Sequence, residues 1–188
     1  MDIRKAEEKD LGILMEIYAH ARAFMRKTGN PGQWKDSYPA EALIREEIRR
    51  GVCYVCVQEN EIEGVFSYLP GPDSTYQRIE GGKWLNEEPY GVVHRLAGRG
   101  RVRGVADCCL EWAVARCGNL RIDTHRDNRV MQHILEKNGF VSCGTIYVAD
   151  GSPRIAYQKV QGKGATAVAE GCDPAERAVS KCREEYGK

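Results

Sequence analysis

Four arginines and three glycines lie between Arg95 and Gly104, directly before an apolar run with helical spacing. No Asp or Glu occurs from Val92 to Ala106. Gly104 allows a ligand to approach the backbone without meeting a side chain. The first amides of the following helix lack helical partners and carry partial positive charge. This combination predicts a site for an anion such as a pyrophosphate at residues 101–106.

Two common phosphate-binding motifs do not fit this stretch. A P-loop places Lys-Ser or Lys-Thr at the start of its helix, and neither pair is present here. In a dinucleotide-binding G-x-G-x-x-G motif that starts with Gly98 and Gly100, the third glycine would stand at position 103. Here it stands one residue later, at Gly104. The whole chain carries 28 Lys and Arg against 27 Asp and Glu. The positive charge is therefore local, and nucleic acid is not an expected partner.

The elements that must position this stretch follow from hydrophobic spacing and turn residues. Strands are predicted near Ile3 and at 52–58, 61–69, 90–98, 119–125, 140–149 and 154–160. Helices are predicted at 11–28, 37–51, 104–118 and 128–139. Asp10 is expected to cap the first helix, and Pro39 to lie in the first turn of the second. Residues 70–89 form a long excursion before the strand that leads to the arginines.

The alternation of strands and helices in the second half predicts a mixed sheet covered by helices. One domain is expected over residues 1–160. Composition changes after that point, and residues 161–188 are predicted to form a C-terminal extension that is partly helical.

Several segments resemble, in order and spacing, those of the GNAT N-acetyltransferases. They are the opening "IRKAEEKDLGILMEIY", the strand and loop "HRLAGRGRVRG", and "RIDTHRDNRVMQHILEKNGF". The resemblance covers residues 3–160. It implies an α/β (α+β) fold with a mixed, mostly antiparallel sheet, splayed between its fourth and fifth strands, and helices on both faces. It also implies acetyl-CoA as cosubstrate, lying in that gap.

The resemblance assigns coenzyme contacts residue by residue. The backbone of Leu96 and Gly98, together with Asn128, would hold the pantetheine arm. Six consecutive residues would hold the pyrophosphate: Arg101, Val102, Arg103, Gly104, Val105 and Ala106. The link from Gly98 to Arg101 departs from the family pattern, because it is shorter and lacks a proline.

Acetyl transfer to an amine needs a base that takes the amine's proton, and histidine has a suitable pKa. His94 lies two residues before Leu96, which predicts that both face one side of the strand. A structural histidine is the alternative. The usual family tyrosine that protonates the leaving thiolate corresponds to Leu135. Either water or another residue then acts as the acid, and Tyr147 is the candidate.

The acceptor site is expected in the least regular segments and on a polar strand face. Trp34, Tyr38 and Trp84 are aromatic residues in loops, which favours ligand contact. In "RIDTH" polar residues alternate along a strand that should be apolar on both faces. Asp123 and His125 therefore either line the acceptor cleft or take part in structural pairs.

Cellular location and metal binding are also constrained. The sequence contains no run of about 18 apolar residues, so no membrane span is predicted. The charged N-terminal segment lacks the apolar core of a signal peptide. We expect a cytoplasmic protein whose eight cysteines are reduced. Cys53 and Cys56 should point to opposite faces of a strand, so no metal site is expected. Family members often pair through edge strands, which makes a homodimer possible.

These observations give one leading hypothesis and two alternatives. The first is an acetyl-CoA-dependent N-acetyltransferase whose acceptor is the primary amine of a small molecule or amino-acid-like substrate. Attack would be direct, in a ternary complex. The second acetylates a protein N-terminus or a lysine, which needs an open groove that residues 70–89 would roof. The third, suggested by Leu135, is a catalytically poor module that binds or senses acyl-CoA.

Overall fold

The computed structural model describes residues 1–34 and 37–162 of the 188-residue chain. Its strands are β1 (Asp2–Lys5), β2 (Cys53–Gln58), β3 (Glu61–Pro70), β4 (Gly91–Gly98), β5 (Asn119–Thr124), β6 (Val141–Tyr147) and β7 (Pro153–Val160). The α-helices are α1 (Leu11–Lys27), α2 (Glu41–Arg49), α3 (Val105–Cys117) and α4 (Arg129–Lys137). Two short 3-10 turns are η1 (Glu8–Asp10) and η2 (Ser74–Tyr76). The predicted C-terminal extension lies almost wholly outside the described residues.

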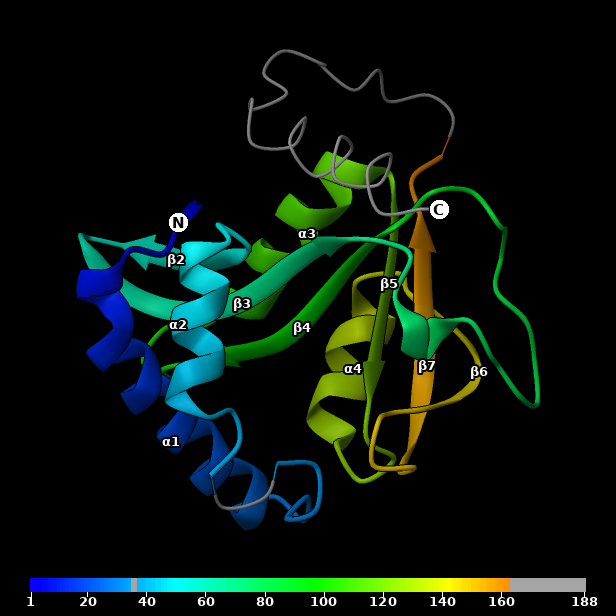
Figure 1. The fold of residues 1–188 in the computed structure, drawn as a ribbon, viewed down its shortest axis with the longest axis horizontal. Helices are drawn as coiled ribbons and strands as arrows, with labels where there is room; N and C mark the ends of the chain where they lie inside the picture. Colours follow the sequence, from blue (N-terminus) through cyan, green and yellow to red (C-terminus); the bar gives the residue numbers. More distant parts are fainter. Residues whose placement is uncertain (35–36, 163–188) are drawn as a thin grey trace, which may run out of the picture.

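The strands form one sheet in the order β1-β2-β3-β4-β5-β7-β6 (Figure 1). Neighbouring strands are antiparallel except β4 and β5, which run parallel. These two pair only at their beginnings, Gly91 with Leu120 and Val92 with Arg121. Beyond that point they separate, which confirms the predicted splay between the fourth and fifth strands.

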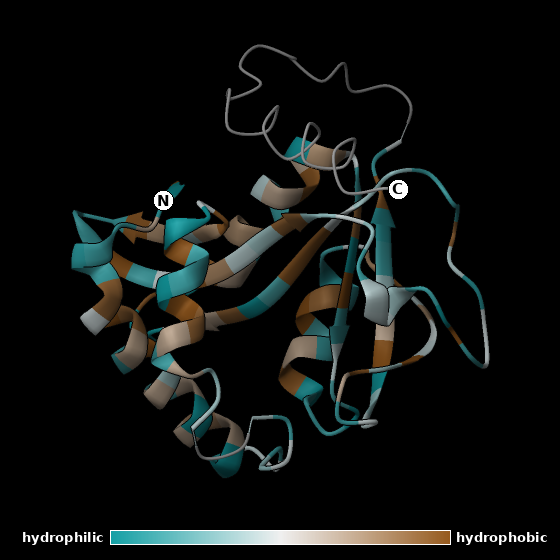
Figure 2. Ribbon diagram, in the orientation of Figure 1, coloured by the Kyte–Doolittle hydropathy of each residue, from teal (hydrophilic) through white to brown (hydrophobic). Residues whose placement is uncertain are grey.

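Amphipathic helices cover both faces of the sheet. Hydrophobic and hydrophilic residues alternate along α1, α2 and α4 (Figure 2). One apolar cluster joins α1 and α2 to β2 and β3, around Leu14, Ile17 and Ile44. A second joins α3 and α4 to the opposite face, around Leu110 and Leu135. Burial of this apolar surface is the main stabilising contribution to the fold.

An extra residue in β4 changes which way its side chains point. The pairing with β3 passes from Ser67↔His94 to Val65↔Ala97, so β4 holds one residue more than β3 in this interval. Arg95 adopts a φ of 54° there, as in a β-bulge. Val93 and Leu96 consequently pack on the α3 face. The prediction that His94 and Leu96 share a strand face is therefore wrong.

Two predicted helix starts also differ in detail. The Asp10 carboxylate accepts from the Glu7 amide and pairs with Arg4 at 2.6 Å instead of capping α1. Pro39 lies before the first helical residue of α2, not inside its first turn. Asn128 does cap α4, because its side-chain oxygen accepts from the Met131 amide at 3.1 Å.

The segment between β3 and β4 packs mainly on β6 and β7. Tyr76 and Trp84 are buried in a third apolar cluster with Ile146 and Ala156. The backbones of Glu80 and Thr145 exchange two hydrogen bonds of 2.8 Å. Only its beginning, at η2, reaches the gap between β4 and β5. The long excursion is therefore an ordered extension of the C-terminal half.

We expect Gly82→Ala to lower the free energy of unfolding by about 1–3 kcal/mol, the usual cost of overpacking. A Cβ at this position would lie 2.1 Å from the carbonyl oxygen of Cys143. Urea denaturation measures the loss. Gly12→Ala is the control, since its Cβ would meet nothing within 4 Å. Equal stability of the two variants would contradict the packing of this segment on β6.

In the described part of the chain, no helix has both the length and the apolar character to cross a membrane. Six described cysteines are free thiols. Cys53 and Cys56 lie in different apolar clusters on opposite faces of the sheet, as predicted.

Candidate functional site

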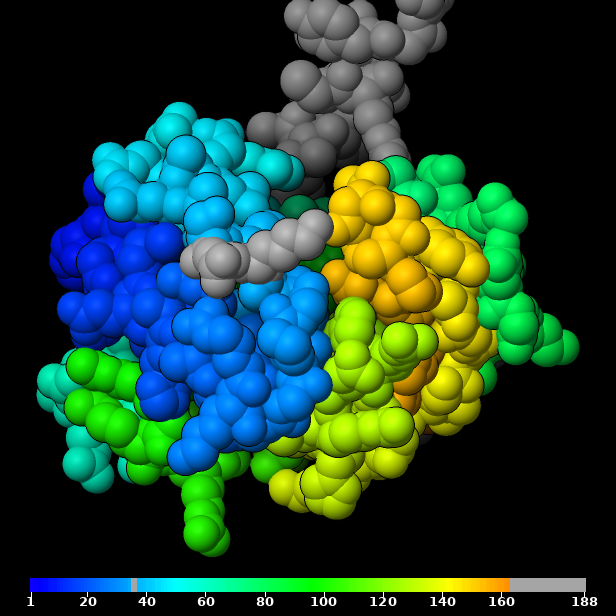
Figure 3. Space-filling model, turned by 90° about the horizontal axis from the view of Figure 1, so that it is seen from below, coloured from blue at the N-terminus to red at the C-terminus, as the bar shows by residue number. Residues whose placement is uncertain are grey.

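A cavity of about 700 Å³ opens where β4 and β5 separate. In the space-filling view, the N-terminal half and the α4–β7 half face each other across a hollow (Figure 3). Its walls come from α1 and the loop after it, from β4 and β5, from the start of α3, and from α4. The sheet splay therefore creates the space, and the helices enclose it.

One end of the cavity reaches the beginning of α3. Gly104, Val105 and Ala106 line it, and Gly104 adopts a φ of 81° as the residue before the helix. No side chain caps the first turn. The Asp107 carboxylate in that turn is held by Lys137 at 2.8 Å and by Asn138. Open amide donors without a competing carboxylate suit a pyrophosphate.

Two of the arginines before α3 pair with carboxylates of the protein itself. Arg101 forms an ion pair with the buried carboxylate of Glu63, and Arg99 pairs with Glu61 at 3.2 Å. These carboxylates lie on β3, far from the arginines in sequence. Arg101, Val102 and Arg103 do not line the cavity. Of the six residues predicted to contact a pyrophosphate, Gly104, Val105 and Ala106 line the cavity, and the contacts themselves stay a prediction.

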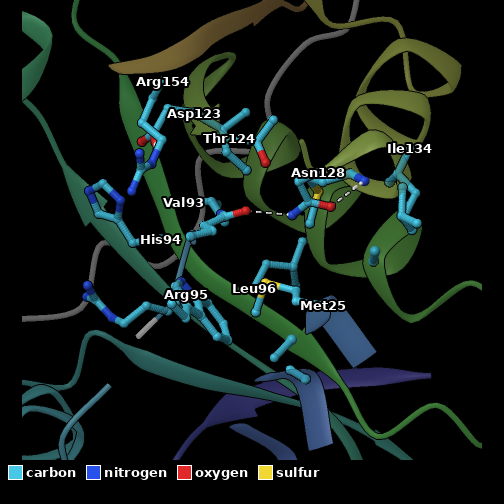
Figure 4. A pocket seen from close by; sticks show the side chains of 18 of the residues that line it. Met25, Val93, His94, Arg95, Leu96, Asp123, Thr124, Asn128, Ile134 and Arg154 are labelled. Carbon is cyan, nitrogen blue, oxygen red and sulfur yellow. Dashed lines mark hydrogen bonds and ion pairs between the residues drawn. The ribbon is translucent and has the colours of Figure 1, made fainter. Parts of the chain in front are cut away.

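Asn128 lines the cavity and is hydrogen-bonded to another residue of its wall. Its side-chain nitrogen donates to the Gln33 oxygen at 2.8 Å, while its oxygen caps α4 (Figure 4). Gln33 belongs to the loop after α1, so this bond joins the two halves of the domain. Leu96 and Gly98 also line the cavity, and their contacts with a pantetheine arm stay a prediction.

At the other end, His94 is paired with the carboxylate of the residue directly before η2. His94 Nε2 lies 2.8 Å from Asp73 Oδ2. The bond from His94 and those from the Thr75 hydroxyl and amide hold the pKa of Asp73 well below its usual range, although burial opposes this. An ionised carboxylate only accepts hydrogen bonds. It therefore favours the His94 tautomer with its proton on Nε2 and its lone pair on Nδ1.

We expect Asp73→Asn to lower the melting temperature at pH 7, and this difference should shrink below about pH 4. A carboxyl whose folded pKa is depressed stabilises the fold above its unfolded pKa. That contribution is lost as the pH falls toward the folded pKa. Calorimetry across the acid range checks this, with the exposed Asp2→Asn as control. A difference that persists unchanged in acid would contradict the pairing.

A second carboxylate, Asp123, lies beside the first pair. It accepts from the buried Tyr76 hydroxyl at 2.8 Å, and Arg154 Nε lies 4.0 Å from its other oxygen. Asp123 and Arg154 both line the cavity (Figure 4). This end of the cavity therefore presents His94, two carboxylates and one guanidinium.

Two of the residues predicted to contact the acceptor also belong to the cavity wall. Trp34 and Tyr38 line the cavity, and their ring centroids lie 6.0 Å apart. The Tyr38 hydroxyl accepts from Arg95 at 3.0 Å. Arg95 also pairs with the buried Glu47 of α2. Arg95, at the β4 bulge, therefore connects Tyr38 in the cavity wall with Glu47 of α2.

Three predicted site residues lie away from the cavity wall. Trp84 is buried under the Arg121 guanidinium, 4.2 Å from its ring centroid. Tyr147 donates to Glu80 at 2.9 Å on the surface, a bond that raises the pKa of Tyr147 and makes it a weaker acid. His125 accepts from the Asp127 amide, and burial lowers the pKa of His125.

Sequence reasoning missed several residues that line the cavity: Gln33, Asp73, Thr75, Arg95, Thr124 and Arg154. Asp73 carried a usable signal, because an aspartate two residues before a threonine forms an Asx-type cap, here at 2.8 Å to the Thr75 amide. The others are brought in by tertiary packing and the β4 bulge.

Comparisons with known proteins agree with this geometry. A family model described as acetyltransferase (GNAT) domain matches residues 1–141. A GNAT-family acetyltransferase structure from Streptococcus agalactiae 2603 is 33% identical, with a TM-score of 0.78 over 86% of this chain and 96% of that one. No match is found among curated proteins.

More distant structures share the fold. A GNAT-family acetyltransferase from Listeria monocytogenes 4b F2365 is 17% identical, with a TM-score of 0.62 over 85% of this chain and 94% of that one. A ribosomal-protein-alanine N-acetyltransferase from Brucella melitensis is 20% identical, with a TM-score of 0.54 over 85% and 99%.

Proposed function

This chain belongs to the GNAT acetyltransferase family, and from that premise we propose that it acetylates the primary amine of a small-molecule or amino-acid-like acceptor. Members of this family use acetyl-CoA as cosubstrate. The pairing of His94 with Asp73 at the wall of the cavity carries the proposal. This pairing supports His94 as the proton acceptor, in a cavity that also reaches the open amides at the start of α3.

The chemistry follows from the His94 tautomer. The amine's proton passes to the lone pair on Nδ1, and its nitrogen forms a bond to the acetyl carbon. The carbon–sulfur bond then breaks and its electron pair stays on sulfur. Asp73 balances the charge of the imidazolium that forms, as carboxylates paired with catalytic histidines do. Asp73 acts as a positioning residue, because it works through His94.

The cavity composition supports direct attack on the thioester. Among the described residues that line the cavity there is no cysteine or serine. Cysteine and serine, activated by an adjacent base, are common nucleophiles of covalent acyl-enzymes. Transfer within a ternary complex needs only the base and correctly placed reactants.

The acceptor end also supports a compact cationic substrate. Asp73 and Asp123 attract an ammonium group, which must lose a proton before attack. Arg154 offers a fork that suits a carboxylate on the same small molecule. Residues 148–150, from the turn between β6 and β7, also line the cavity. A cytoplasmic location and a homodimer remain predictions.

Comparing acceptors in one assay tests the proposal. Small amines and amino acids should exceed peptides in kcat/KM by about tenfold or more, a difference of about 1.4 kcal/mol in the barrier. Peptides with a free N-terminus and peptides with an internal lysine form the second and third groups. Faster acetylation of either peptide group would contradict the small-acceptor proposal. Binding of acetyl-CoA without transfer to any acceptor would instead favour the sensing module.

A further inference from the structure

The leaving thiolate has no partner at the usual family position. Leu135 occupies that position, is fully buried, and packs in the cluster of α3 and α4. Tyr147 lies outside the cavity wall. Breaking the carbon–sulfur bond leaves negative charge on sulfur, and a hydrogen-bond donor at that point would stabilise it. Another donor in the cavity wall would have to take this role.

Three described side chains in the cavity wall carry a hydroxyl group: Tyr38, Thr75 and Thr124. The Thr75 hydroxyl donates to Asp73 at 2.6 Å. The Tyr38 hydroxyl is bound to Arg95, and the tyrosine is 38% exposed. Thr124 is fully buried, and its Oγ1 has no hydrogen-bond partner among the described residues.

A buried hydroxyl without a partner costs free energy, so most such groups in proteins are hydrogen-bonded. Exceptions call for an explanation, and a ligand is one. Thr124 belongs to the cavity wall, whereas a hydroxyl deep in the core would face only apolar neighbours. We therefore infer that the hydroxyl donates to a group of a ligand that enters the cavity.

The sheet register places Thr124 at the reacting centre. The last parallel pair is Val92 with Arg121, and both strands continue from there along the widening gap. Three residues further on, Thr124 lies at the level of Arg95, beside the β4 bulge. Figure 4 shows Thr124 between Asp123, at the acceptor end, and Asn128, at the coenzyme end. The thioester must lie between these two ends.

We propose that the Thr124 hydroxyl donates a hydrogen bond to the coenzyme sulfur and stabilises the departing thiolate. The inference rests on the proposed function for the identity of the ligand. The hydroxyl keeps its proton, because an alcohol is a far weaker acid than a thiol, whose pKa is about 8.5. The thiolate takes its final proton from solvent.

The first test titrates the thiol of bound coenzyme A by the ultraviolet absorbance of its thiolate. Desulfo-coenzyme A supplies the blank, so the protein's own cysteines cancel. The pKa of the bound thiol should be about 1–2 units higher in Thr124→Val than in the unaltered protein, a 10- to 100-fold change in the thiolate equilibrium. Thr124→Ser keeps the hydroxyl and should restore the lower pKa. Equal pKa values in all three proteins would overturn the proposal.

A second measurement separates ligand contact from a structural role. In the free protein, Thr124→Val should melt at the same temperature as the unaltered protein or higher, because an unpaired buried hydroxyl is removed. Marked destabilisation of Thr124→Val relative to Thr124→Ser would show an internal partner and overturn the proposal. A Tyr38→Phe protein that shifts the thiol pKa while Thr124→Val does not would also overturn it.

The kinetic outcome separates this inference from the proposed function. With an active amine, kcat of Thr124→Val should fall by about 10- to 100-fold, and acetyl-CoA affinity should stay nearly constant. If no amine is acetylated, the proposed function fails, and the thiol titration still decides the role of Thr124. If amines are acetylated but the pKa of the bound thiol is the same in the unaltered protein and in both Thr124 variants, this inference alone fails.

Discussion

The His94→Gln enzyme should acetylate its amine about 100- to 10,000-fold more slowly than the unaltered enzyme, the usual loss when a general base is removed. Glutamine keeps a hydrogen bond to Asp73 within reach but offers no nitrogen lone pair to accept a proton. Thiol release from acetyl-CoA, followed against pH, measures the loss. The gap between the enzymes should narrow at high pH, where the amine loses its proton to solvent.

Two controls accompany this measurement. His133→Gln changes an exposed residue of α4 outside the cavity and should leave the rate unchanged. The affinity of His94→Gln for acetyl-CoA and its melting temperature should also stay close to those of the unaltered protein. A rate that falls only slightly would assign His94 a structural role instead of catalysis.

Gly104→Val should weaken acetyl-CoA binding by about 100-fold, since each lost hydrogen bond to a charged phosphate costs about 1.5–3 kcal/mol. Gly104 adopts a φ of 81°, which L side chains rarely adopt. Valine would shift this backbone and cover the amides of the first α3 turn. Calorimetric titration with acetyl-CoA measures the change.

Gly118→Val is the matched control at the other end of α3. Gly118 also has a positive φ, 64°, and a Cβ there would meet nothing within 4 Å. Both variants carry similar backbone strain, but only Gly104 lines the cavity. Equal coenzyme affinities in the two variants would contradict the placement of the pyrophosphate at the start of α3.

The sequence predicted the framework well because local patterns specify it. Alternating and helical hydrophobic spacing marked the strands and helices, and a resemblance supplied the splay between β4 and β5. The start of the fourth helix was predictable because its cap, Asn128 to the Met131 amide, is a local interaction. These features depend on residues close in sequence, so a single chain contains enough information to find them.

The errors have a different physical origin. The β4 bulge inserts one residue at Arg95 and reverses the alternation that placed His94 and Leu96 on one face. Arg101 meets Glu63 only because β3 and β4 pair across the sheet. Trp84 occurs in a loop-like segment yet becomes buried against Arg121. Each outcome depends on tertiary contacts, which leave no pattern in the local sequence.

The acceptor end was predictable only in part for the same reason. Asp123 stood out because a charged residue on a central strand is unusual. Its partners Tyr76 and Arg154 come from η2 and β7, and no spacing connects them. The pair of His94 and Asp73 joins residues 21 positions apart through a segment whose path follows from packing.

The central claim is that an amine in this cavity attacks bound acetyl-CoA directly, and single-turnover mixing tests it most simply. Enzyme in excess is mixed with acetyl-CoA, first without an acceptor and then with a small primary amine, while released thiol and acetylated amine are counted together. We predict no thiol release before the amine is added, followed by thiol and acetylated amine in equal amounts. A burst of thiol without any amine, or bound acetyl-CoA that stays intact with every amine, would contradict the account.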